Sequence, residues 1–530
     1  MSWPSDLLPE RWRGALLAVT GGAAWGACHG IGTKPLLALV ALAPFAVLLG
    51  HRRAGWLGWL HGAVAWGVAI PWIVPTLTDF GLISGWLAGI GLLLLAAFLG
   101  LYDAAFAVLG ARLWRRGDAL SLAALPALWV ALEVARGRLF SGFPWNLAAY
   151  AWVDLPGALP LSSWTGAWGV SYLVVLANVL VAAGVARRRW QPALLGLLLP
   201  LTLLPIAARF ATLPDPPGGA RLARVVQPDI PNRPFFDAAA TAADYSRLLA
   251  TSRAACEPGV LLLWPESAAW PRNWQDDVQL RLDLQTLVRE RGCALLFNTA
   301  FDDGGRTYNS VMLVESAASG SPAPEAWAAG ARAGTEGLTL QRADKRHLVP
   351  FGEYVPLRRW LPFVGKIARM VGDFSPAAGI SLLDWRGERL GAAVCYEVVF
   401  PGETAALVAA GATALVTVTN DGWYGDSAAP RQHLRAARFR AAENRRWLLR
   451  AAVTGISAVV RPDGSLAAVA EVGEERVLSA RFVGRADRSP FSRAPWLVPA
   501  LAFALATVAS WRARHLGSRG GTRSSRVDGG

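Results

Sequence analysis

The chain has 530 residues, of which 53% are hydrophobic and 17% are charged. A soluble globular protein usually has about a quarter of its residues charged, so this composition excludes a wholly soluble chain. The formal net charge of +14 comes almost entirely from arginine, which lies mainly in short loops between apolar segments and in the C-terminal tail. This placement, in a chain with no motif that reads RNA or DNA, favours membrane orientation over nucleic-acid binding.

Seven apolar segments precede residue 215, and membrane-spanning helices need about 20 such residues. We expect spans at 12–29, 35–50, 55–77, 83–110, 119–135, 164–186 and 191–210, and an eighth at 494–511. The sequence therefore predicts a membrane domain over 1–215 with seven transmembrane helices and a soluble domain over 216–490. An eighth transmembrane helix over 491–514 and a basic, disordered tail over 515–530 complete the predicted organisation.

Basic residues between these segments predict the orientation of the chain. With eight spans, five basic clusters fall on one side of the membrane, and the positive-inside rule assigns that side to the cytoplasm. The clusters are Arg11 and Arg13; Arg52 and Arg53; Arg112, Arg115 and Arg116; Arg187, Arg188 and Arg189; and Arg512, Arg514, Arg519, Arg523 and Arg526. Both termini are then cytoplasmic, and the soluble domain lies on the opposite side, which is the periplasm for a bacterial inner membrane.

An aromatic loop at 136–152 lies on the same predicted outer side as the soluble domain. Phe143 and Trp145 are among its rings, and aromatic rings suit a membrane interface because one edge can meet lipid while a polar end meets water. The loop is either a wall of a lipid entry site or an ordinary aromatic belt, and the sequence leaves both interpretations open.

The soluble part alternates strand-like and helical runs, which predicts an α/β sandwich. The strand-like runs are 221–227, 260–266, 293–300, 309–316, 338–345, 389–395, 412–420 and 455–464, and helical patterns include 274–290 and 431–447. A long region at 349–379, punctuated by Pro and Gly, carries Trp360, Phe363 and Phe374 and is a candidate lid.

Three polar residues end apolar runs in this part: Glu266 in VLLLWPES, Lys345 in LTLQRADKRH and Cys395 in RLGAAVCYE. Chemistry in open α/β sheets collects beyond the carboxyl ends of strands. A carboxylate base, a cation and a thiol together form a covalent acyl-transfer site. Taken singly, each also has a structural interpretation, as a salt-bridged carboxylate, a surface lysine or a buried thiol. His347 is a competing base, which would pair with Cys395 as in papain-like enzymes.

The four cysteines, Cys28, Cys256, Cys293 and Cys395, form neither a disulfide framework nor a cluster with zinc spacing. We therefore expect no metal and no cofactor. Cys256 and Cys293 pair if the soluble part faces an oxidising compartment, or else remain two buried thiols. The sequence does not decide between these alternatives.

The runs WPES, DKRHLVPFGEYVP, CYEVVFP and NDGWYGDSAAPRQHLRAARFRAAEN resemble the motifs of apolipoprotein N-acyltransferases, which are membrane members of the nitrilase (carbon–nitrogen hydrolase) superfamily. The resemblance implies a nitrilase-like α-β-β-α sandwich on a membrane part of about eight helices. It implies a Glu266–Lys345–Cys395 triad, a second essential carboxylate at Glu353, and supporting roles for Tyr396 and Glu397. The candidate substrate-binding or lid residues are Phe143, Trp145, Phe236, Trp264, Trp423 and Tyr424. Two departures are Phe236, where the family often has Trp, and Val453, where it usually has Asn.

The resemblance also implies the reaction. An acyl chain passes from a phospholipid, with the sn-1 chain of phosphatidylethanolamine expected, to a thioester on Cys395. It then passes to the α-amine of the diacylglyceryl N-terminal cysteine of an apolipoprotein, in the last step of lipoprotein maturation. The expected partners are these two substrates and the bilayer, and the enzyme is expected to be a monomer.

Two other functions are compatible with parts of the pattern. A membrane-tethered amidase or nitrilase would use the same triad on a small soluble amide. A transporter or scaffold with a non-catalytic outer domain would bury ionisable residues in its spans, and Asp103 and Glu133 are the few candidates.

Overall fold

The computed structural model describes residues 10–515 except 82, 210–213, 215, 217–218, 234, 318–336 and 355–372. The chain divides into two compact units. The helical unit comprises Met1–Val74, Gly85–Ala211 and Ala494–Gly530, and the sandwich unit comprises Pro75–Ser84 and Thr212–Arg493. Trp360 and Phe363 of the predicted lid and residues 516–530 of the predicted tail lie outside the described residues.

Helices occupy all eight positions at which we expected spans. They are α1 (Glu10–Ala27), α2 (Pro35–Ala38) with α3 (Ala43–Leu48), α4 (Ala54–Ala69) with α5 (Ile73–Pro75), α6 (Gly85–Arg116), α7 (Ala119–Arg136), α8 (Ala158–Ala186), α9 (Trp190–Arg209) and α16 (Leu497–His515). Two short 3-10 turns, η2 (Leu139–Ser141) and η3 (Ala148–Trp152), lie between α7 and α8.

Four of the described helices, α6 to α9, are long and apolar enough to cross a membrane. A fifth span results if α4 and the segment Ile73–Phe80 count as one, although the two are bent by 66°. The helix over the span predicted at 55–77 is therefore broken, and whether it crosses the membrane stays a prediction. Pro71 and Pro75 lie at and just beyond the break, and proline removes a helical hydrogen bond and clashes with the preceding turn. The count of eight spans stays a prediction.

Close helix packing holds the helical unit together where side chains are smallest. Helix α4 packs against α1 and α6. A Cβ atom added to Gly62 would lie only 2.7 Å from the Cα atom of Gly100, and one added to Gly100 would lie 2.7 Å from the nitrogen of Ala63. The two backbones therefore touch, as small residues allow in membrane helix pairs.

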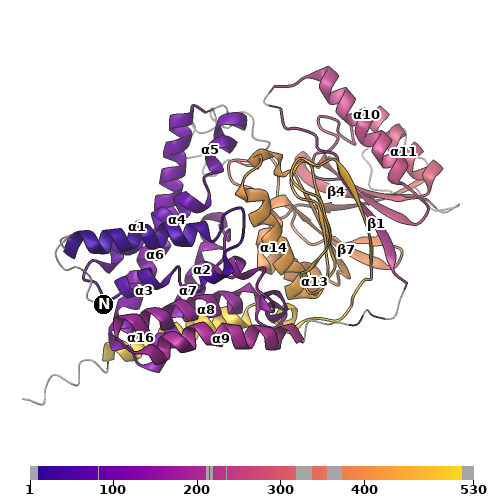
Figure 1. Ribbon diagram of the computed structural model, residues 1–530. Coiled ribbons are helices and arrows are strands. Elements are labelled where there is room, and N and C mark those ends of the chain that lie inside the picture. Colours follow the sequence, from indigo (N-terminus) through magenta and orange to yellow (C-terminus); the bar gives the residue numbers. More distant parts are fainter. Residues whose placement is uncertain are drawn as a thin grey trace, which may run out of the picture. The chain divides into compact units, whose positions relative to one another are not determined.

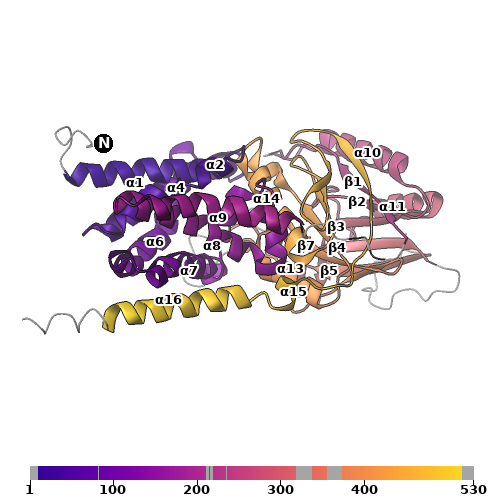
Figure 2. The same ribbon diagram turned by 60° about the horizontal axis from the view of Figure 1, so that its bottom comes forward.

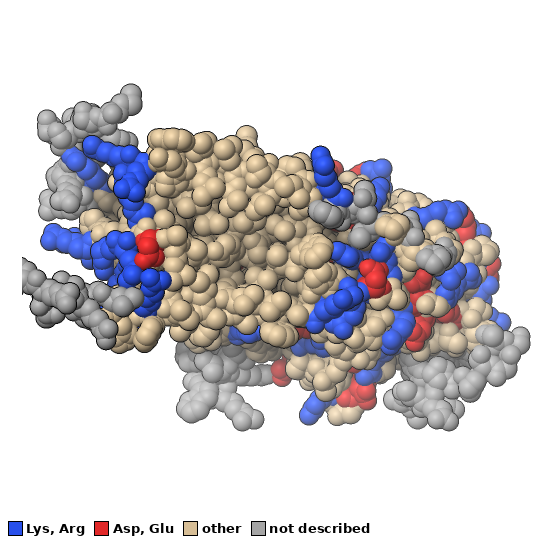
Figure 3. Space-filling view, turned by 90° about the horizontal axis from the view of Figure 1, so that it is seen from below, with Lys and Arg blue, Asp and Glu red and all other residues tan. Residues whose placement is uncertain are grey.

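Basic residues gather at one end of the helical unit. The Arg187 guanidinium donates to the Trp114 carbonyl oxygen at 2.8 Å and lies over the Trp114 ring. Gly50, which stands just before Arg52 and Arg53, also lies against Trp114, because a Cβ atom added to this glycine would be 3.2 Å from Trp114 Nε1. Three of the predicted clusters, at 52–53, 112–116 and 187–189, therefore meet at one end. Figure 3 shows Lys and Arg gathered beside a wide surface of the helical unit that carries almost no charge.

The sandwich unit contains two sheets of six strands each. The first has the order β12-β1-β2-β3-β4-β5 and the second has the order β11-β10-β9-β8-β7-β6. The strands of the first sheet are β1 (Arg221–Gln227), β2 (Val260–Leu263), β3 (Ala294–Asp303), β4 (Arg306–Ser316), β5 (Leu338–Asp344) and β12 (Arg476–Phe482). Those of the second sheet are β6 (Leu383–Trp385), β7 (Glu388–Val394), β8 (Ala414–Thr419), β9 (Leu448–Ala452), β10 (Ala458–Val460) and β11 (Leu466–Val469).

One apolar core lies between the two sheets and a second lies under the helices of the first sheet. Leu261, Leu263 and Leu296 of the first sheet belong to the same buried cluster as Val416 and Leu449 of the second sheet. Helices α10 (Ala238–Ala255) and α11 (Val278–Arg291) pack on the first sheet. Helices α13 (Pro401–Ala409) and α14 (Ala428–Asn444) pack on the second sheet, as Figures 1 and 2 show. The predicted α-β-β-α sandwich is therefore confirmed.

The segment Pro75–Ser84, which lies between two membrane-type helices in the sequence, belongs to the sandwich unit. It contains the π-helical turn η1 (Thr76–Phe80), which packs on the 3-10 turn η5 (Asp421–Tyr424). The Thr76 hydroxyl donates to the Trp423 carbonyl oxygen at 2.9 Å, and the Phe80 and Trp423 rings pack edge to face with centroids 4.9 Å apart. Trp423 is thus anchored by a piece of chain that is distant in sequence.

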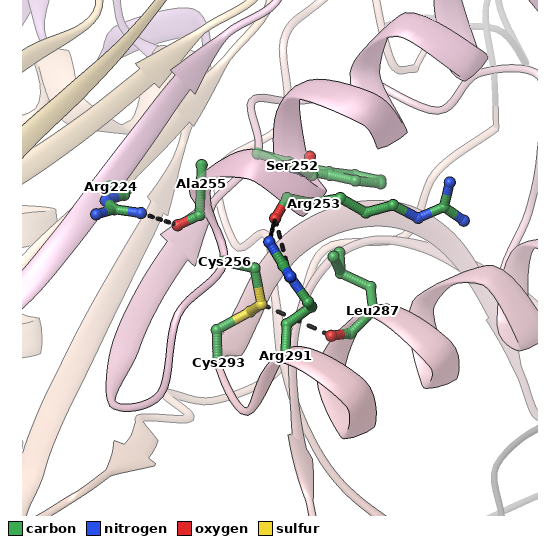
Figure 4. Close-up of a disulfide and its surroundings, with 9 residues drawn as sticks. Arg224, Ser252, Arg253, Ala255, Cys256, Leu287, Arg291 and Cys293 are labelled. Atoms are coloured by element: carbon green, nitrogen blue, oxygen red, sulfur yellow. Dashed lines mark hydrogen bonds between the residues drawn. A yellow bond between two sulfur atoms is a disulfide. The ribbon is translucent and has the colours of Figure 1, made fainter.

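Cys256 and Cys293 form a disulfide, so the alternative of two free thiols is wrong. Cys256 caps the end of α10 and Cys293 precedes β3, with their Cα atoms 5.4 Å apart. Figure 4 shows the bond with Arg224 and Arg291, which donate to the carbonyl oxygens of the last α10 residues. The bond ties a covering helix to the first sheet.

Replacing both cysteines of this bond with alanine should lower the free energy of unfolding of the sandwich unit by about 3–4 kcal/mol, because the bond closes a loop with a sequence separation of 37. Guanidinium titration of the detergent-solubilised chain measures the change. Cys28→Ala, which removes a buried thiol outside any disulfide, is the matched control. An equal, small effect of both changes would contradict the prediction.

Candidate active site

Glu266, Lys345 and Cys395 lie just beyond the ends of β2, β5 and β7. Their relative exposures are 7%, 1% and 8%. Ionisable groups are almost never buried without partners, so the interpretation of Lys345 as a solvated surface lysine is wrong. The sheet order brings these three strand ends from two different sheets toward one site.

Lys345 is held between two carboxylates. Its Nζ atom lies 2.9 Å from the Glu353 carboxylate and 3.9 Å from Glu266 Oε1. Burial by itself would lower the pKa of Lys345, but the negative charges of Glu353 and Glu266 outweigh it and raise the pKa above its usual value. Lys345 is therefore a fixed ammonium at neutral pH, and a fixed positive charge can stabilise an oxyanion.

Glu266 is positioned by two amide donors. Asn309 Nδ2 donates to Glu266 Oε1 at 3.0 Å and also to Glu353 Oε1 at 2.8 Å, and the backbone N–H of Asn420 donates to Glu266 Oε2 at 3.0 Å. Burial raises the pKa of Glu266, Lys345 lowers it, and the charge of Glu353 raises it again, so that the net shift is upward. A carboxylate with a raised pKa is a better general base near neutral pH.

Cys395 occupies a sharp turn between β7 and the 3-10 helix η4 (Cys395–Val399). Its φ angle is 51°, in the left-handed region that costs a non-glycine residue about 1–2 kcal/mol. Burial and the charge of Glu266 raise the pKa of the thiol, and Lys345 lowers it. The thiol is therefore protonated at rest, and forming the thiolate requires a base in the same site.

Glu397 holds the turn by accepting three backbone N–H groups. Its carboxylate accepts backbone N–H groups of Arg346 at 2.7 Å, His347 at 3.0 Å and Val394 at 2.7 Å. These bonds tie the residues after Lys345 to the residue before Cys395. They fix the main chain next to Lys345 relative to the main chain next to Cys395.

The competing base His347 packs elsewhere. Its ring lies against the Phe400 ring, with centroids 3.9 Å apart, and near Tyr396, at 6.1 Å. The charges to which the Cys395 pKa responds are those of Glu266, Lys345 and Asp421. This geometry favours Glu266 as the base.

The predicted substrate-binding residues fall in different places. Trp264 is fully buried under α10 and donates from Nε1 to Ser252 Oγ at 2.8 Å, so it serves as core packing and is not open to a substrate. Phe236 is 61% exposed and contacts Trp270, and Trp423 is 44% exposed. Tyr424 lies near the thiol, since burial and then the charge of Cys395 raise its pKa.

Phe143 and Trp145 pack inside the helical unit. The Phe143 ring contacts Trp66 with centroids 5.9 Å apart, and Trp145 contacts Trp72 at 5.4 Å. Arg136 donates to the carbonyl oxygens of both residues, at 2.8 and 2.7 Å. The loop is thus well ordered, and its part in lipid entry stays a prediction.

Asp103 and Glu133, the residues on which a transporter interpretation depends, both have partners in the helical unit. Asp103 Oδ1 lies 3.1 Å from His61 Nδ1. Glu133 Oε1 accepts from Trp129 Nε1 at 3.1 Å and from the Ala148 N–H at 2.7 Å. These contacts give Asp103 and one oxygen of Glu133 partners within the helical unit.

Sequence reasoning missed Asn309 and Asn420, which hold the base, and a buried cluster of Asp421, His433 and Arg450. Asn309 lies in the middle of β4, and His433 lies inside α14. The available signal was the run NDGWYGDSAAPRQHL, which carries Asn420 and Asp421 at one turn and His433 in the helix that follows.

Glu353→Gln should move the acid limb of the pH profile of kcat/KM to lower pH. With Glu266 as the expected base, its carboxylate must be ionised, so activity should be present above its pKa and be lost as the pH falls through it. The Glu353 charge raises that pKa, and its removal therefore lowers it. The maximal rate should also fall, by roughly 10²-fold, because Lys345 loses its 2.9 Å partner. Glu403→Gln, which removes the partially exposed partner of Arg346, is the control and should leave the limb in place. A shift to higher pH in Glu353→Gln would contradict the assignment of Glu266 as base.

Two family models match the chain. The apolipoprotein N-acyltransferase N-terminal domain matches residues 20–180, and the carbon-nitrogen hydrolase model matches residues 222–485. An apolipoprotein N-acyltransferase of Geobacter metallireducens is 38% identical over 468 residues, which are 84% of this chain and 85% of the relative. Another, of Ralstonia nicotianae, is 34% identical over 474 residues, which are 86% of this chain and 85% of the relative. The likeness therefore extends over both units.

Proposed function

Because the chain belongs to the apolipoprotein N-acyltransferase family, we propose that it transfers an acyl chain from a phospholipid to the α-amine of the S-diacylglyceryl N-terminal cysteine of apolipoproteins, as the last step of lipoprotein maturation. The proposed donor is the sn-1 chain of phosphatidylethanolamine. The observation that carries the proposal is the buried Lys345 ammonium, 2.9 Å from Glu353 and 3.9 Å from Glu266, whose charge also acts on the Cys395 thiol. A base, a cation and a nucleophile in one buried site are the groups that covalent acyl transfer needs.

The first half of the reaction forms a thioester. Glu266 takes the proton of the Cys395 thiol, and the thiolate attacks the ester carbonyl carbon of the phospholipid. The new C–S bond places a negative charge on the carbonyl oxygen, which Lys345 and backbone N–H groups near Cys395 stabilise. One such donor is typically worth about 3 kcal/mol. When the C–O ester bond breaks, Glu266 returns the proton to the leaving oxygen and lysophospholipid departs.

The second half transfers the acyl chain. The α-amine of the diacylglyceryl cysteine attacks the thioester carbon, and Glu266 takes a proton from the attacking nitrogen. The C–S bond then breaks, an amide bond remains on the lipoprotein, and the proton on Glu266 returns to the Cys395 thiolate. The enzyme is thereby ready for another phospholipid, which makes the kinetics ping-pong.

We further propose that this membrane-embedded protein works in the bacterial inner membrane, as a monomer, with its sandwich unit in the periplasm and its termini in the cytoplasm. Two observations support this orientation. Basic clusters meet at one end of the helical unit, as the positive-inside rule requires of a cytoplasmic face. The Cys256–Cys293 disulfide lies in the sandwich unit, and disulfides persist mainly in oxidising compartments such as the periplasm.

Intact mass measurement of the purified full-length enzyme tests the proposal. After incubation with phosphatidylethanolamine alone, we expect a mass increase of one fatty-acyl chain, located on Cys395 by peptide mapping. Addition of a diacylglyceryl lipopeptide should remove the increment and yield an N-acylated peptide.

The rival function, a membrane-tethered amidase, predicts a different outcome. An amidase would leave no fatty-acyl increment on Cys395 and would release ammonia or an amine from a small amide. A phospholipid-derived increment on any other residue, or none at all, would overturn the proposed reaction.

A further inference from the structure

A buried cluster of three charged or polar side chains contacts the main chain of Cys395. Asp421 comes from η5, His433 from α14 and Arg450 from β9, and each is at most 1% exposed. His433 Nδ1 lies 3.0 Å from Asp421 Oδ1 and 3.1 Å from an Arg450 nitrogen, and Arg450 also donates to Asp421 Oδ2 at 2.5 Å. Buried polar groups with this many partners fix one arrangement.

The cluster reaches the nucleophile through a backbone oxygen. His433 Nε2 lies 3.0 Å from the carbonyl oxygen of Cys395. A carbonyl oxygen only accepts hydrogen bonds, so Nε2 carries a proton and donates it to this bond. His433 is therefore not placed to take the proton of the thiol. It holds the main chain of the residue whose side chain reacts.

That main chain is in an unfavourable conformation. Cys395 has φ = 51°, and a non-glycine residue stays in this region only where its surroundings hold it there. Glu397 secures the residue before the turn by accepting the Val394 N–H at 2.7 Å. His433 secures the carbonyl on the other side of the Cys395 Cα atom.

The strand end beside the cluster links it to the base. Thr419 lies near enough to Cys395 to lower the pKa of its thiol, and its hydroxyl donates to Asp421 at 2.9 Å. The next residue, Asn420, donates its N–H to Glu266. Residues 419–421 thus run from beside the thiol, through the backbone donor to the base, to Asp421 of the cluster.

We propose that His433, whose Nδ1 accepts a hydrogen bond from the Arg450 that Asp421 binds in turn, is a positioning residue for the nucleophile: its Nε2–H bond to the Cys395 carbonyl keeps the left-handed turn that directs the thiol at Glu266 and Lys345. The inference rests on the proposed function, because it takes Cys395 as the acyl carrier. Loss of this bond should slow acylation and leave phospholipid binding nearly unchanged, since His433 is only 1% exposed and bonds to the main chain.

A matched pair of amide substitutions tests the proposal in the full-length enzyme. The side-chain nitrogen of glutamine reaches about as far as Nε2 of histidine, and that of asparagine does not. His433→Gln should therefore retain most of the single-turnover rate of acyl-enzyme formation. His433→Asn should lose roughly 10²-fold of that rate, the scale on which a 1 Å misplacement acts, with KM within about 2-fold. Equal rates in the two variants, or a loss confined to KM, would overturn the proposal.

A second measurement does not depend on lipid. The rate at which iodoacetamide alkylates Cys395 should be lower in His433→Asn than in His433→Gln, at equal melting temperatures. If His433→Asn fails to fold, His433→Leu, which fills a similar volume without a donor, replaces it and should show the same loss relative to His433→Gln. If the wild type forms no acyl-enzyme but alkylation still separates the two amides, the proposed reaction fails and the role of His433 stands. If acylation proceeds and alkylation is the same in both, only the role of His433 fails.

Discussion

Replacement of Cys395 by alanine is expected to abolish both acyl-enzyme formation and transfer to an apolipoprotein. Alanine has no nucleophilic atom, and Glu266 and Lys345 alone cannot form the covalent intermediate. Removal of a nucleophile from a catalytic unit typically costs about 10⁶-fold in kcat, so the residual rate should not rise above background. Mass spectrometry of the enzyme and gel-shift analysis of a lipoprotein substrate measure the two steps separately.

Two further variants serve as controls for Cys395→Ala. Cys28→Ala removes the other free thiol, which lies in the helical unit, and should leave both steps intact. Cys395→Ser keeps an oxygen nucleophile in the same turn, but a hydroxyl is harder to ionise beside a carboxylate base than a thiol. We expect no measurable transfer from it. Substantial transfer by Cys395→Ala would mean that the acyl carrier is another residue.

Lys345→Met should reduce kcat by at least about 10³-fold and also destabilise the sandwich unit. Methionine fills a similar volume without charge, so the oxyanion loses its cation. Lys345 also lowers the pKa of Glu266. Its loss raises that pKa further, and a protonated Glu266 cannot accept the thiol proton. Breaking a buried ion pair on one side typically costs about 3–5 kcal/mol, which calorimetry of the purified enzyme can measure.

The double variant Lys345→Met with Glu353→Gln separates the two effects. Removing Glu353 as well takes away a carboxylate that the single variant leaves without its cation. Much of the lost stability should therefore return, whereas catalysis should not. If the double variant regained activity together with stability, Lys345 would be a structural residue and not part of the reaction.

The strand ends of the site could be predicted because the signal is local. Glu266, Lys345 and Cys395 each follow an apolar run within three residues, and a polar residue in that position is visible without knowledge of the fold. The sandwich could be predicted for the same reason, since strands such as β2, β8 and β9 are unbroken runs of buried residues. Lys345 also stood out because lysine is rare in a chain whose basic residues are almost all arginine.

The residues that hold these groups could not be found in this way because their roles depend on contacts between distant segments. Asn309 reaches Glu266 only because β4 pairs with β3 in one register. His433 fits the helical pattern of α14, and its bond to Cys395 crosses 38 positions. Whether Cys256 and Cys293 pair depends on a Cα separation of 5.4 Å, which is set by where a helix ends and a strand begins. Trp264 was misjudged because proximity in sequence to Glu266 does not give the face toward which a ring points.

The anchoring of Trp423 by Thr76 and Phe80 bears on how this enzyme can be dissected. A fragment expressed from Thr212 to Arg493 would look like a complete hydrolase-type domain, yet it would lack Pro75–Ser84, which belongs to the same compact body. Such a fragment would expose one side of the turn that begins next to Asn420, the backbone donor to Glu266. The catalytic unit is thus assembled from two separate stretches of the polypeptide. Low activity of a truncated protein could therefore come from the loss of Pro75–Ser84 as well as from the loss of the membrane helices.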